Sequence, residues 1–115
     1  MSKSDIPIDW ESTSYDDLML FPTDAKQSAG FQLGRLQQGL EPTDWKPLNN
    51  LGKGVTGVKE IRIWEVSGGY RVAYTAKFRD AITVFHSFKK TTQQTSKKDI
   101  ELIVKRYRVA AARQM

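Results

Sequence analysis

The chain of 115 residues contains no cysteine and a single histidine, His86. Without cysteine it has neither a disulfide framework nor a thiolate metal site, which suits a reducing compartment. No apolar run approaches the roughly 20 residues that span a membrane, and the N-terminal stretch MSKSDIPIDWESTS lacks the apolar core of a signal peptide. These absences predict a cytoplasmic protein that makes no membrane contact.

The length suits one domain with a single hydrophobic core. We therefore expect a single domain over residues 1–115, in which residues 1–13 form a loose N-terminal segment with a short strand. We expect no bound cofactor, because the sequence has no second histidine, no cluster of metal ligands and no Ser–His–Asp set that we can place. Metal catalysis and acyl transfer therefore have no support.

Positive charge is concentrated in the second half of the chain. Residues 1–57 carry five basic and eight acidic side chains, a net charge of −3, whereas residues 58–115 carry thirteen and five, a net charge of +8. Within that half, the stretch FKKTTQQTSKK holds four lysines and no acidic residue. This asymmetry favours a polyanion or an acidic protein as the partner, although an ordinary solubilising surface produces the same pattern.

Hydrophobic periodicity predicts the order β-α-α-β-β-β-α. A short strand at 6–10 precedes two helices, the first ending before Pro22 and the second before Pro42. Three strands follow at 58–66, 70–78 and 81–88, and the last helix is capped by Ser96 with Asp99 three residues on. This order predicts an α+β domain with a largely antiparallel sheet.

Strand alternation predicts a basic face on this sheet. Gly68 and Gly69 are expected to form a two-residue hairpin loop, which places apolar side chains on one face and Arg62, Trp64 and Arg71 on the other, exposed one. If the alternate residues of the next strand, up to Phe88, face the core, then Lys89 joins the arginines and Lys90 points to the other side. Fixed cations on one face suit the binding of a phosphodiester.

Other side chains are candidates for RNA chemistry, each with an ordinary structural role as the alternative. Trp45 and Trp64 could stack on bases, because such stacking needs only an aromatic face. His86 could transfer a proton during RNA cleavage through the 2′-hydroxyl, although it lies in an apolar strand on the side expected to face the core. The glycines of LGKGVTG match a nucleotide-binding spacing, but without the strand and helix that this motif needs they predict a flexible loop.

Several segments in order, EIRI, YRVAY and FKKTTQQTSKKDIE after WKPL and a glycine-rich loop, resemble the phage-derived, HigB-like branch of the RelE/ParE toxin superfamily. The resemblance covers about residues 15–107. It implies a compact RelE fold with helices packed on one face of the sheet. It further implies the toxin of a type II toxin–antitoxin system, a metal-independent endoribonuclease (an mRNA interferase) that cleaves messenger RNA on the ribosome and inhibits translation. Its implied partners are the ribosome, messenger RNA and a cognate antitoxin of the helix-turn-helix type.

The resemblance assigns Arg71, Arg62 and the basic pair Lys89 and Lys90 to the site. With the candidates taken from the residues themselves, the expected catalytic side chains are Arg71, Arg62, Lys89 and His86, and the expected RNA-binding side chains are Lys90, Lys97, Lys98, Lys46, Lys77, Trp45 and Trp64. No tyrosine follows Lys90 where RelE-type members often have a catalytic one, so the general base stays open. Two alternatives also stay open: a non-catalytic, prophage-derived remnant of the same fold that binds RNA or protein, and a ParE-like poison of DNA gyrase.

Overall fold

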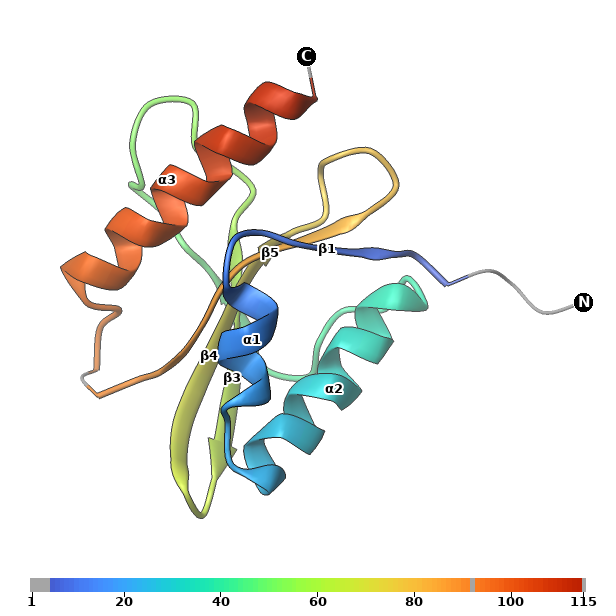
Figure 1. Cartoon of the computed structure of the whole chain (residues 1–115), viewed down its shortest axis with the longest axis vertical. Coiled ribbons are helices and arrows are strands. Elements are labelled where there is room, and N and C mark those ends of the chain that lie inside the picture. The colour runs from blue at the N-terminus through green and yellow to red at the C-terminus, as the bar shows by residue number, and fades with distance from the viewer. Residues whose placement is uncertain (1–4, 92, 115) are drawn as a thin grey trace, which may run out of the picture.

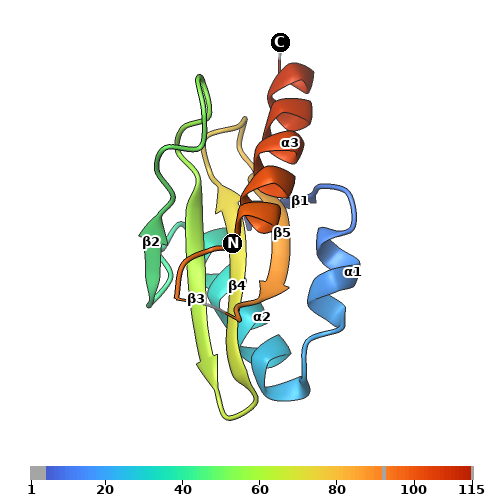
Figure 2. The same ribbon diagram turned by 90° about the vertical axis from the view of Figure 1, so that its left-hand side faces the viewer.

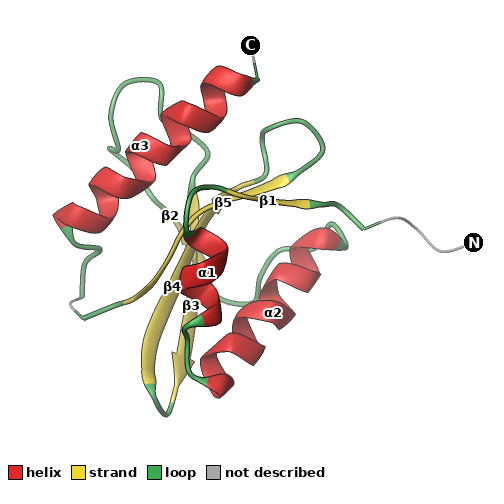
Figure 3. Cartoon of the chain, in the orientation of Figure 1, coloured by secondary structure: helices red, strands yellow, loops and turns green. Residues whose placement is uncertain are grey.

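The structure is a computed structural model that describes residues 5–91 and 93–114. Its elements follow the expected order with one addition, the short strand β2 (Figures 1 and 3). Their bounds are β1 Ile8–Trp10, α1 Ser14–Met19, α2 Thr23–Gln37, β2 Trp45–Pro47, β3 Lys59–Glu65, β4 Gly68–Thr75, β5 Ile82–Lys89 and α3 Lys97–Arg113. No helix in these described ranges is long and apolar enough to cross a membrane.

One five-stranded sheet organises the domain, in the order β1-β5-β4-β3-β2. Among the strands that the structure describes, only the pair β1–β5 is parallel, and the other neighbours are antiparallel. The α+β class and the largely antiparallel sheet are therefore confirmed. The part of the expected N-terminal segment at 1–4 lies outside the described residues.

The turn between β3 and β4 differs from the expected glycine loop. Val66 and Ser67 form the turn, and Gly68 is the first residue of β4, with a φ of +134° that favours glycine. Arg62 consequently lies opposite Arg71. A loop of Gly68 and Gly69 would have placed Arg62 opposite Thr75, four residues further along β4. Because this shift is an even number of residues, every side chain of the hairpin keeps its expected face.

A bulge in β5 overturns the expected facing of the residues after it. Ala73 pairs with His86 but Tyr74 pairs with Val84, so Phe85 is an extra residue on β5. Beyond it, His86 and Phe88 lie on the face of Arg71, and Lys89, opposite Tyr70, lies on the other. The expectation that Lys89 joins the arginines is wrong; the bulge gives that place to Lys90.

Helices cover both faces of the sheet, so the expectation that they pack on one face is also wrong. Leu18 of α1 and Leu33 of α2 pack on the strand face that carries Val72, whereas Ile103 of α3 packs with Phe85 on the opposite face. The central strands are apolar on both faces along part of their length, and each apolar face must pack against another element. Figures 1 and 2 show that α3 crosses only one end of its face and leaves the β3–β4 hairpin end uncovered.

Candidate functional site

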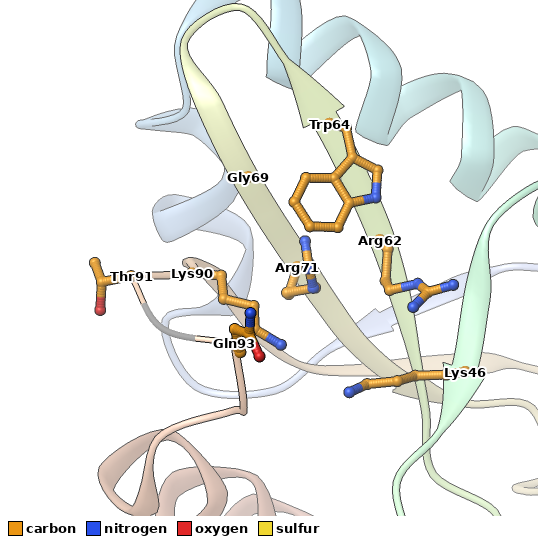
Figure 4. Close-up of a pocket in the computed structure, with 8 residues that line it drawn as sticks. All are labelled: Lys46, Arg62, Trp64, Gly69, Arg71, Lys90, Thr91 and Gln93. Carbon is orange, nitrogen blue, oxygen red and sulfur yellow. The ribbon is translucent and has the colours of Figure 1, made fainter.

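The uncovered end of the α3 face holds a pocket of about 710 Å³, which we call the cationic pocket (Figure 4). It lies among β2, β3, β4 and the segment that follows β5. None of its described lining residues is acidic, and four are basic. The lining residues are Lys46, Arg62, Trp64, Gly69, Arg71, Lys90, Thr91 and Gln93.

Strand pairing explains why these basic side chains meet. Lys46 in β2 lies opposite Glu60, and Arg62 in β3 lies opposite Arg71 in β4, so alternate positions of three strands share this face. The Lys90 N–H donates to the Gly69 carbonyl at 2.9 Å, which keeps the chain beside β4 after β5 ends. The pocket therefore combines cations from three separate parts of the sequence.

Arg71 forms the buried floor of this pocket, contrary to its expected exposure. Arg71 is only 1% exposed to solvent. The ring of Trp64 covers the guanidinium, with 4.3 Å between the guanidinium carbon and the ring centroid. Nη1 donates to the Tyr70 carbonyl at 2.9 Å, and Nε lies 3.4 Å from Oε1 of Glu60. Burial lowers the pKa of Arg71, and the negative charge of Glu60 opposes that shift.

Glu60 is the functional position that sequence reasoning missed. It is fully buried beneath the cations, and its Oε2 accepts a hydrogen bond of 2.8 Å from the Thr95 hydroxyl. Its Oε1 lies 4.0 Å from Nζ of Lys46 as well as close to Arg71. Glu60 thus compensates two cations and attaches the β5–α3 connection to the sheet. The sequence feature that could have identified Glu60 is the alternation within EIRI, which places it on the same face of the strand as Arg62.

Three cations remain partly accessible at the rim. Arg62 keeps 37% of its side chain exposed while Nε and Nη2 contact Oδ1 of Asp44 at 2.8 and 2.7 Å. Lys46 is similarly exposed, at 36%. Burial lowers the pKa of Lys90, and the charge of nearby Lys46 lowers it further. This arrangement can bind an anion.

The structure places His86, Lys89 and Lys98 at a different cavity, of about 620 Å³, between α1, β5 and α3. His86 Nε2 lies 2.7 Å from Oδ1 of Asp99, and Nδ1 lies 3.5 Å from Nη1 of Arg106. Because an arginine only donates, Nδ1 is the acceptor and the Nε2–H donates to Asp99. His86 therefore links β5 to the first turn of α3 and lies outside the cationic pocket.

The remaining expected RNA-binding residues are also outside this pocket. Trp45 lies opposite Ile61, on the face that α1 and α2 cover. Lys77 donates to the Thr56 hydroxyl at 2.7 Å, and Lys97 is an exposed residue at the start of α3. No group of three or more histidine or carboxylate side chains that could hold a metal ion occurs among the described residues.

Comparison with protein-family models gives a match over most of the chain. The model of the family described as "Phage derived protein Gp49-like (DUF891)" matches residues 16–108, which is most of the chain and includes every residue of the cationic pocket. A search of curated proteins finds no significant match. The family match does not separate a HigB-like branch from other members.

Proposed function

We propose that this chain, which belongs to the phage-derived Gp49-like family within the RelE/ParE-like toxin superfamily, is a toxin that cleaves messenger RNA on the ribosome. The observation that carries the proposal is the cationic pocket. Lys46, Arg62 and Lys90 surround a space open to solvent, and a buried arginine lies beneath it. Preorganised positive charge of this kind stabilises the extra negative charge of a phosphodiester under attack.

The reaction is an attack of the 2′-hydroxyl on the adjacent phosphorus. The bond from the 2′-oxygen to phosphorus forms and the bond to the 5′-oxygen breaks, which leaves a 2′,3′-cyclic phosphate and a 5′-hydroxyl. One proton leaves the 2′-oxygen to a base, and water supplies one proton to the 5′-oxygen. We assign removal of the first proton to Lys90, because it lines the pocket beside Arg62 and Lys46, held there by the hydrogen bond from its N–H to the Gly69 carbonyl. Partial burial, which lowers the pKa of Lys90, favours the neutral amine in the same direction.

The other cations act on the phosphate. Arg62 and Lys46 at the rim contact its oxygens, and Arg62 does so with the part of its guanidinium that Asp44 leaves accessible. Arg71 contributes positive potential from beneath without contacting RNA, because Trp64 and Glu60 enclose it. Catalysis then relies mainly on positioning and charge.

The partners follow from the same proposal. The ribosome and its message are polyanions, which suits the net charge of +8 on residues 58–115. A cognate antitoxin, of the helix-turn-helix type by the resemblance above, would neutralise the toxin. Family membership supports such a toxin–antitoxin pairing.

The experiment is a cleavage assay with translating ribosomes and a defined message. We expect the purified protein to cleave ribosome-bound message and to leave naked message intact, with 5′-hydroxyl ends at the cuts. Intact message and normal translation with folded protein in excess would contradict the proposal and leave the non-catalytic alternative. A DNA supercoiling assay run in parallel tests the gyrase alternative, which the proposal expects to be negative.

A further inference from the structure

We propose that the outer face of Trp64 is a stacking platform for one base of single-stranded RNA. The inference rests on the proposed function, because it places the phosphate of that nucleotide in the cationic pocket. Trp64 lines this pocket together with the rim cations Lys46 and Lys90. In Figure 4 the indole is drawn above Arg71 and Arg62.

The indole is held in place from three sides. One face lies on the Arg71 guanidinium at 4.3 Å. Its Nε1–H donates to Oδ2 of Asp44 at 3.1 Å, while Oδ1 of the same carboxylate binds Arg62. The edge of the ring lies against Gly69, where an added Cβ would come within 3.1 Å of Cζ3. The ring is therefore preorganised, and stacking on it costs little side-chain entropy.

The residue nevertheless remains 62% exposed, which is unusual for the largest apolar side chain at a fixed orientation. Its inner face contacts Arg71, so the exposed area belongs to the outer face and the rim of the ring. An exposed aromatic face beside a cationic groove is the arrangement with which proteins bind single strands. The other tryptophan proposed for stacking, Trp45, lies on the opposite face of the sheet.

The contacts of Trp64 also predict how the platform selects its ligand. Nε1–H is the only hydrogen-bond donor of an indole ring, and Asp44 already accepts from it. The ring therefore has no polar group with which to distinguish the edges of bases. Selectivity should follow stacking area alone, with purines bound more tightly than pyrimidines at this position.

The test uses single-stranded RNA of about ten nucleotides, the length range of known single-strand sites. Binding is compared for the intact RNA and for versions with one abasic nucleotide placed at each position in turn. We expect Trp64→Leu to weaken binding of intact RNA about tenfold, as for the loss of one stacked base, and Trp64→Phe to recover most of it. When the abasic nucleotide occupies the stacked position, wild type and Trp64→Leu should bind equally.

A direct readout guards against misfolding of the variant. In the Trp10→Phe/Trp45→Phe background, Trp64 is the only tryptophan, and bound intact RNA should quench its fluorescence while RNA abasic at the stacked position should not. Binding without quenching in this background overturns the inference, as does equal binding by folded Trp64→Leu and wild type. If Lys90→Ala still weakens binding in that case, the proposed function survives. If neither variant changes binding, both proposals are contradicted.

Discussion

Arg71 shows how a residue can have a predictable direction and an unpredictable environment. Strand alternation placed it on the basic face, and the structure confirms that direction. Its burial depends on Trp64 from the neighbouring strand and on Glu60, whose own partner Thr95 is 35 residues away along the chain. Such non-local contacts are invisible to periodicity, which reports only the face of a strand on which a side chain lies.

We predict that Arg71→Ala destabilises the fold severely, by about 3–5 kcal/mol, because it removes the buried cation that lies closest to the buried Glu60 carboxylate and leaves only the more distant, partly exposed Lys46. The double variant Glu60→Leu/Arg71→Met should lose less than Arg71→Ala, since it removes both charges and keeps volume. Denaturant unfolding measures all three proteins, with the exposed Lys105→Ala as the control. An unfolding free energy of Arg71→Ala within about 0.5 kcal/mol of wild type would show that the pair contributes nothing.

At the scale of elements, periodicity predicted where the helices and strands lie in the chain better than it predicted which face of the sheet each strand residue is on. Ser96 caps α3 as expected, accepting from the Asp99 N–H at 3.1 Å. The bulge at Phe85 had no signal in AITVFHSF, because β5 is buried on both faces and its polar residues Thr83, His86 and Ser87 are buried as well as its apolar ones. One extra residue was enough to exchange the positions expected for Lys89 and Lys90.

The link from His86 to Asp99 predicts a structural role for the histidine. We expect His86→Ala to lower the melting temperature, with a loss of about 1–3 kcal/mol of unfolding free energy, because a partly buried hydrogen bond between β5 and α3 is lost. Ser96→Ala, which removes the cap of the same helix, should destabilise by about 1 kcal/mol. Below the melting range, cleavage of ribosome-bound message by His86→Ala should match wild type. A large loss of rate at an unchanged melting temperature would instead make His86 catalytic.

At the scale of the whole molecule, the two faces of the sheet differ in how they are used. α1 and α2 cover one face, whereas the other is divided between the core beneath α3 and the cationic pocket. The segment after β5 contributes Lys90, Thr91 and Gln93 to the pocket, and Thr95 fastens it to Glu60. The resemblance predicted the superfamily correctly. Lys89 and Trp45 lie outside the cationic pocket because they are on the other face of the sheet. His86 is on the face of Arg71 but lies outside the pocket, next to Asp99 at the start of α3.

The neighbouring lysines Lys89 and Lys90 provide the most direct test of the central claim, that the cationic pocket cleaves RNA. They differ by one position and point to opposite faces of the sheet, so Ala substitutions remove the same charge from the two sides. In the assay with ribosome-bound message, we predict that Lys90→Ala slows cleavage about 100-fold or more, as for loss of a proton-transfer group, while Lys89→Ala cleaves at close to the wild-type rate. Equal losses in both variants, or normal cleavage by Lys90→Ala, would contradict the account.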